Sequence, residues 1–101
     1  VDRPLVYSPR SNKCAHADWR GQFIGVMDNV SKALEAGGAT WDDVMFIRKF
    51  TTDMDAFLAI SDVPDYWDPD KAPSSTLIEV VKLSEPCQLI EIDVMAVVGA
   101  K

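Results

Sequence analysis

The sequence predicts an α+β fold in which two helices pack on one face of a β-sheet. Residues 19–36 repeat apolar side chains at helical spacing, residues 44–50 are rich in β-branched and aromatic side chains, and residues 89–98 alternate between two faces. The 101 residues, 48% of them hydrophobic, suffice for one core. We therefore expect a single domain over residues 1–101.

The first elements are a short strand at residues 5–8 and, after a turn-rich break, the longest helix. Asp18 can cap the start of this helix with its side-chain oxygen, and Gly37 and Gly38 supply a glycine stop. The apolar face that should be buried consists of Phe23, Val26, Met27, Val30, Ala33 and Leu34.

After the glycines, Thr40 and Asp43 form a capping-box pattern for a short turn, and residues 44–50 form a strand. Arg48 and Lys49 are adjacent in this strand and must point to opposite faces. One interpretation is that one cation reaches solvent at a strand end while the other extends past its apolar neighbours. The alternative is an anion-binding cation in a cleft.

A second, shorter helix is predicted from a capping-box pattern at Thr52 and Asp55 to a stop near Ser61, before Pro64. Its apolar residues are Met54, Phe57, Leu58 and Ile60. The loop that follows contains three aspartates but lacks the glycine and the terminal glutamate of a calcium loop. We therefore expect a solvated loop and no metal at Asp65, Asp68 and Asp70.

Residues 76–83 and 89–98 are predicted strands, and the short connection 84–88 predicts an antiparallel hairpin between them. One face of the last strand is apolar and should lie against the helices: Ile90, Ile92, Val94, Ala96 and Val98. The other face carries Glu91 and Asp93, about 7 Å apart, among apolar neighbours. Glu79 repeats this pattern in the preceding strand. We expect these acidic faces to meet another subunit or a cavity.

Composition excludes several classes of protein. The formal charge of −6 and a pI near 4.5 argue against a nucleic-acid partner, which requires clustered cations. The sequence has neither an apolar run of about 20 residues nor a signal peptide, so we expect a soluble, cytoplasmic protein without a membrane partner. Cys14 and Cys87 have no metal-binding spacing and predict two free thiols. We expect His16, the only histidine, to lie on the surface. We expect no cofactor.

Four segments in this order resemble the YjgF/Rid family, also called the reactive intermediate deaminase family: LEAGGATWDDV, FTTDMDAF, APSSTLIEVVKL and LIEIDVMAV. The resemblance covers about residues 19–98, and Gln22 and Asn29 match residue types of the family's first helix. It implies a chorismate-mutase-like fold and a homotrimer with small-molecule clefts between subunits. It also implies hydrolysis of reactive enamines and imines to ketones and ammonia.

By this resemblance, Glu91 matches the family acid that positions the attacking water, and Tyr7 matches a tyrosine near the N-terminus. The family arginine that binds the substrate carboxylate aligns with Ser75, and the asparagine after the second helix aligns with Ser61. The SGQ strand that precedes the family's first helix has no counterpart. Either the sheet has fewer strands or the sequence omits residues of the intact protein.

Two functions follow. The first is an enamine or imine deaminase in which Glu91 holds a water in an apolar pocket, with Arg48 or Lys49 supplying the charge that Ser75 lacks. The alternative is a non-catalytic binding or regulatory trimer that recognises a small molecule through Glu91 and the hydroxyls of Ser75 and Thr76. Glu91 could also be a core acid held by a backbone donor. A ribonuclease, a third activity attached to the family, is disfavoured by the acidic composition.

Overall fold

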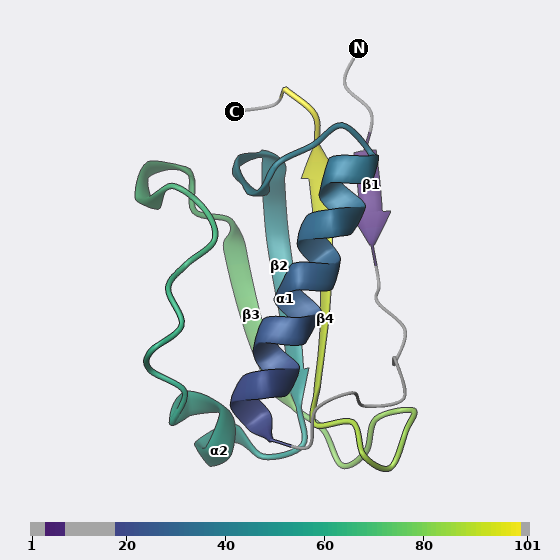
Figure 1. The fold of residues 1–101 in the computed structure, drawn as a ribbon, viewed down its shortest axis with the longest axis vertical. Helices are drawn as coiled ribbons and strands as arrows, with labels where there is room; N and C mark the ends of the chain where they lie inside the picture. Colours follow the sequence, from purple (N-terminus) through teal and green to yellow (C-terminus); the bar gives the residue numbers. More distant parts are fainter. Residues whose placement is uncertain (1–3, 8–17, 100–101) are drawn as a thin grey trace.

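The computed structural model of the chain describes residues 4–7 and 18–99, with side chains from residue 18 onward. A four-stranded sheet in the order β1-β4-β2-β3 carries the long helix on one face (Figure 1). The predicted α+β fold is confirmed. In chain order the elements are β1 (Pro4–Tyr7), α1 (Trp19–Ala36), the 3₁₀ turn η1 (Trp41–Asp43), β2 (Val44–Thr51), α2 (Met54–Leu58), the 3₁₀ turn η2 (Pro69–Lys71), β3 (Ser74–Glu79) and β4 (Ile90–Val97).

The predicted start and stop of α1 are confirmed. The Asp18 carboxylate accepts a hydrogen bond from the Gly21 amide at 3.1 Å, which satisfies one of the free donors of the first turn. After the helix, Gly38 has a φ of 79°, a conformation that glycine adopts without strain. The next turn also begins as predicted, because the Asp43 carboxylate accepts a hydrogen bond from the Thr40 amide at 2.9 Å.

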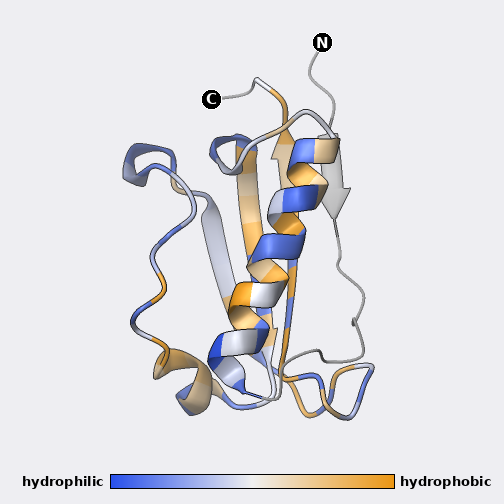
Figure 2. Ribbon diagram, viewed as in Figure 1, coloured by the Kyte–Doolittle hydropathy of each residue, from blue (hydrophilic) through white to orange (hydrophobic). Residues whose placement is uncertain are grey.

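The core lies between α1 and the central strands β2 and β4. The predicted apolar face of β4 is confirmed, since its alternate residues are at most 1% exposed: Ile90, Ile92, Val94 and Ala96. Met27, Val30 and Leu34 of α1 are buried with them. Figure 2 shows this arrangement as apolar colouring along β2 and β4, with polar colour on the outward side of α1. Burial of these side chains is the main stabilising contribution.

The predicted hairpin between the last two strands is wrong. β3 pairs in parallel with β2, and β4 pairs antiparallel with β2 on the other side. The 22 residues 52–73 carry the chain back along the sheet, which a parallel pairing requires. Beyond β3 the chain turns around the end of β2, where the Val80 amide donates to the Thr51 carbonyl and the Thr52 amide donates to the Leu89 carbonyl. β3 therefore ends at Glu79 and is an edge strand.

The second helix is shorter than predicted, and its cap differs. Asp53, and not Thr52, caps α2 by accepting a hydrogen bond from the Ala56 amide at 3.1 Å. The Glu79 carboxylate accepts a second hydrogen bond, from the Met54 amide, at 2.8 Å. Glu79 therefore lies on the helical side of the sheet, which corrects its predicted place on the face of Glu91. Its carboxylate stabilises the free donors at the start of a helix.

The Gln22 side chain connects α1 to the beginning of β4. Its Nε2 donates to the Cys87 carbonyl and its Oε1 accepts from the Leu89 amide, both at 2.8 Å. Gln22 is buried. Its side-chain amide supplies the hydrogen-bond partners of two backbone groups at this point, in place of water. This contact fixes the position at which β4 starts, directly before Glu91.

Several predictions concern the ends of the chain. β1 corresponds to the predicted strand at residues 5–8 except for Ser8, which lies outside the described residues, as do Cys14 and His16.

Cys87 is disulfide-bonded, so the prediction of a free thiol is wrong at this position. No helix in the described part of the chain is long and apolar enough to cross a membrane.

Candidate functional site

The face of the sheet opposite the helices, called here the open face, carries three of the predicted site residues: Glu91, Thr76 and Arg48. Strand alternation and the pairing registers place its side chains in three rows across β3, β2 and β4. The rows are Ser74, Phe46 and Met95; Thr76, Arg48 and Asp93; and Ile78, Phe50 and Glu91. Neighbouring strands lie about 5 Å apart, so residues within a row are in reach of one another.

An ion pair occupies the middle row. The Arg48 guanidinium donates two hydrogen bonds to the Asp93 carboxylate, at 2.8 Å from Nε and 2.6 Å from Nη2. This hydrogen bonding and the adjacent negative charge raise the pKa of Arg48. The guanidinium also lies 5.7 Å from the ring centroid of Phe46 and 5.9 Å from that of Phe50. Asp93 retains only 13% exposure of its side chain, so this pair is a fixed feature of the open face.

Glu91 lies one row from the ion pair. It is paired in register with Phe50 and is half-buried, and Asp93 follows on the same face about 7 Å along the strand. Its immediate surroundings on the sheet are therefore apolar on β2 and acidic along β4. The face predicted for Glu91 is confirmed by the burial pattern of β4.

Lys49 lies on the opposite, helical face, as the alternation along β2 requires. It is half-buried between two buried neighbours on its own face, Ile47 and Thr51. Burial lowers the pKa of Lys49, and the charge of Asp65 opposes this shift. In the pairing register, Lys49 is opposite Leu77 and Ser75 is opposite Ile47. Lys49 and Ser75 are therefore diagonal neighbours on one face, with Cα atoms about 7 to 8 Å apart.

The structure brings together some predicted site residues and separates others. Thr76 lies beside Arg48 on the open face, whereas Ser75 points to the face away from Glu91. Ser61 is exposed in the segment after α2. Tyr7 is paired with Val94 in the sheet, and its side chain lies outside the described part of the chain. A single chain therefore does not gather Glu91 and Ser75 at one point.

One aspartate of the acidic loop has a structural role. The Asp68 carboxylate accepts a hydrogen bond from the Asp70 amide at 2.9 Å and thereby caps η2. Within the described residues, no group of three or more histidine, cysteine or acidic side chains could hold a metal ion.

The sequence analysis did not identify Phe46 and Phe50 as neighbours of the site, although their period-two spacing around Arg48 was the available signal.

Comparison with known proteins supports the resemblance. The family model described as Endoribonuclease L-PSP matches residues 5–98. A curated relative, the RutC family protein of Sulfurisphaera tokodaii, is 32% identical over 98% of this chain and 78% of the relative. The fold is similar to that of a YjgF family member from Neisseria meningitidis, with a TM-score of 0.73 and 17% identity over 96% of this chain and 78% of that chain. A family member from Mycobacterium tuberculosis gives a TM-score of 0.67 and 22% identity over 93% of this chain and 75% of that chain.

Proposed function

The chain belongs to the YjgF/RutC (Rid) family, and on this premise we propose that it acts on a small metabolite in a cleft between the subunits of a homotrimer. The proposed reaction is the hydrolysis of an enamine or imine, with Glu91 positioning the water. The observation that carries this proposal is the open face itself. Within the described residues no helix covers it (Figure 1). It nevertheless holds a half-buried acid among aromatic and aliphatic side chains.

The proposed chemistry needs a positioned carboxylate and a site that excludes bulk water. The Glu91 carboxylate accepts a proton from the water as the water oxygen bonds to the imine carbon. Glu91 then passes this proton to the nitrogen, and the carbon–nitrogen bond breaks as the new hydroxyl group gives up its proton, which releases ammonia and leaves a ketone. Phe50 and the other apolar residues of the open face would exclude water around the reacting carbon.

The separation of Glu91 from Ser75 supports a cleft built from two chains. These residues lie on opposite faces and are separated by one intervening strand. A small ligand that contacts both therefore needs Glu91 from one subunit and Ser75 from another. Lys49 shares the face of Ser75, whereas Arg48 lies on the other face in its pair with Asp93. Of the two cations on β2, we propose Lys49 as the one that takes part in binding a ligand carboxylate.

We expect three chains of 11.2 kDa in the particle. Ile78 lies on the open face and is 39% exposed, so Ile78→Lys should weaken assembly by placing a charge in the interface. Val81, 91% exposed and outside the strand, provides the matched control Val81→Lys. Light scattering coupled to size exclusion measures both variants. A natural chain that stays monomeric at micromolar concentration would contradict the proposal.

Activity on an imino acid should be low in the natural chain and higher in Ser75→Arg. A guanidinium binds a carboxylate through two charge-assisted hydrogen bonds, and the serine hydroxyl offers one neutral donor. A charged hydrogen bond of roughly 1.5 to 3 kcal/mol corresponds to a gain of about ten- to a hundredfold in kcat/KM. Ammonia release from freshly generated 2-iminobutanoate measures this gain.

The controls for this experiment are Lys49→Ala and Arg48→Ala. Lys49→Ala should lower the residual activity further, because it removes the cation next to Ser75. Arg48→Ala should act on assembly, because it leaves Asp93 without its partner. High natural activity that survives both alanine substitutions would show that no missing cation limits this protein.

The alternative is a trimer that binds a metabolite without turning it over. It keeps the same open face and predicts ligand binding by the natural chain with no ammonia release from any variant, including Ser75→Arg. A ribonuclease has less support, although the family model carries that description. The formal charge is −6, and the arginine at the centre of the open face is paired with Asp93. We expect no binding of nucleic acid to this face.

A further inference from the structure

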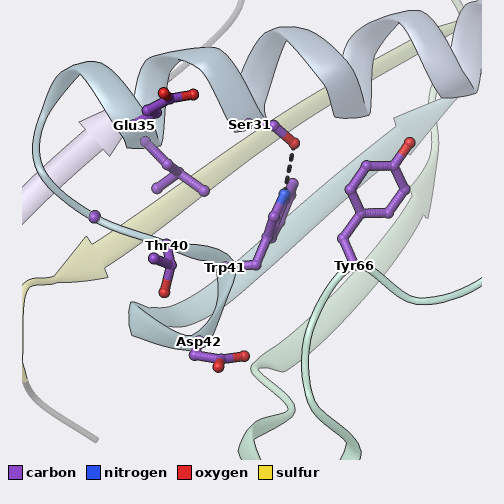
Figure 3. A pocket seen from close by; sticks show the side chains of 8 residues that line it. Ser31, Glu35, Thr40, Trp41, Asp42 and Tyr66 are labelled. Atoms are coloured by element: carbon purple, nitrogen blue, oxygen red, sulfur yellow. Dashed lines mark hydrogen bonds between the residues drawn. The ribbon is translucent and has the colours of Figure 1, made fainter.

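A hollow lies on the helical side of the sheet, away from Glu91. It is an open pocket of about 370 Å³ between the last turns of α1, the turn η1 and the loop at Tyr66 (Figure 3). We call it the Trp41 pocket. Its lining residues are Ser31, Leu34, Glu35, Ala39, Thr40, Trp41, Asp42 and Tyr66. None of them belongs to the proposed site on the open face.

Two aromatic rings form a fixed wall of the Trp41 pocket. The indole Nε1 of Trp41 donates to the Ser31 hydroxyl at 2.7 Å, and that hydroxyl donates to the Met27 carbonyl at 2.9 Å. The Tyr66 ring meets Trp41 edge-on with centroids 5.6 Å apart, and its hydroxyl donates to Asp28 at 3.1 Å. The polar atoms of both rings are thus already hydrogen-bonded. Trp41 is only 8% exposed, so a ligand would contact mainly the half-buried Tyr66 ring, whose π-system favours cations.

The charged side chains that line the Trp41 pocket are both acidic. Its lining contains two carboxylates, Glu35 and Asp42, and no lysine, arginine or histidine. Asp42 already accepts a hydrogen bond from the Asp68 amide at 3.0 Å, and Lys71 approaches its other oxygen at 3.9 Å. The Glu35 side chain is exposed and forms no hydrogen bond or ion pair with the described residues. Its charge is therefore available to a ligand, and the formal net charge of −6 further disfavours an anion.

We propose that the Trp41 pocket binds a small organic cation of the alkylammonium class. The carbon groups around the nitrogen would contact Trp41 and Tyr66, and the positive charge would lie towards Glu35. A bare metal ion fits poorly, because the lining offers only two carboxylates and one of them, Asp42, already contacts the Asp68 amide and Lys71. This proposal does not depend on the function proposed for the open face.

The test is a titration with choline followed by the indole N–H signal of Trp41 in a ¹H–¹⁵N spectrum. The signal is identified with Ser31→Ala, because loss of the hydroxyl acceptor should shift this resonance most, and Trp67, whose ring lies 5.8 Å from that of Trp41, should respond less. Choline should produce a saturable shift at millimolar concentration. 3,3-Dimethylbutan-1-ol has the same shape without the charge and should bind more weakly.

A matched pair of variants tests the role of charge. Glu35→Gln should weaken choline binding by about two- to fivefold, the range expected for an exposed ion pair. Glu85→Gln removes an exposed acid in the loop before β4, outside the pocket lining, and should leave binding unchanged. Equal shifts with choline and its neutral analogue, absence of saturation, or an equal effect of the two variants would overturn the proposal.

Discussion

Replacing Leu34 by alanine should lower the free energy of unfolding by about 3 to 4 kcal/mol. Leu34 lies in the last turns of α1 and is 1% exposed within the core formed with β2 and β4. The substitution removes buried carbon atoms and leaves a cavity that the sheet cannot close completely. Urea denaturation at one fixed protein concentration measures the loss, because assembly would couple to unfolding.

Leu58→Ala is the matched control for this prediction. Leu58 also lies in a helix, so the change in helix propensity is similar, but its side chain is 63% exposed. We expect a loss below about 1 kcal/mol. If Leu34→Ala and Leu58→Ala lose the same free energy, the core is not where the burial pattern places it.

Residues with a strict local period were predicted well. β4 alternates between buried and half-buried positions along its whole length, and the sequence shows the same alternation from Ile90 to Ala96. The caps of α1 and η1 also follow from short-range hydrogen bonds, of Asp18 with Gly21 and of Asp43 with Thr40. In these cases the residues that decide the structure are within four positions of one another.

Strand pairing depends on contacts far apart in the sequence and was predicted less well. The short segment 84–88 looks like a hairpin connection, but it carries the chain past the end of β2. Only the resulting register shows that Ser75 lies with Lys49 on one face and that Glu91 lies on the other. The Trp41 pocket was missed for the same reason, since its walls come from three separate segments.

The Glu91→Gln variant should lose enamine and imine hydrolysis by about 10²- to 10⁴-fold, the contribution typical of a general base. Glutamine keeps the size and polarity of the side chain but is a much weaker proton acceptor than a carboxylate. Glu91 is half-buried on a face that the proposed assembly completes, so assembly and melting temperature should stay close to those of the natural chain. Glu85→Gln, which removes an exposed acid, should keep full activity.

The most direct measurement is the rate of ammonia release from freshly generated 2-iminobutanoate by Glu91→Gln. The rate is compared with that of the natural chain and repeated with both chains carrying Ser75→Arg, so that weak carboxylate binding does not hide the chemistry. We predict loss of hydrolysis in both backgrounds by trimers that melt normally. Hydrolysis at the unsubstituted rate, or a large fall in melting temperature with the rate per folded chain unchanged, would contradict a catalytic role for Glu91.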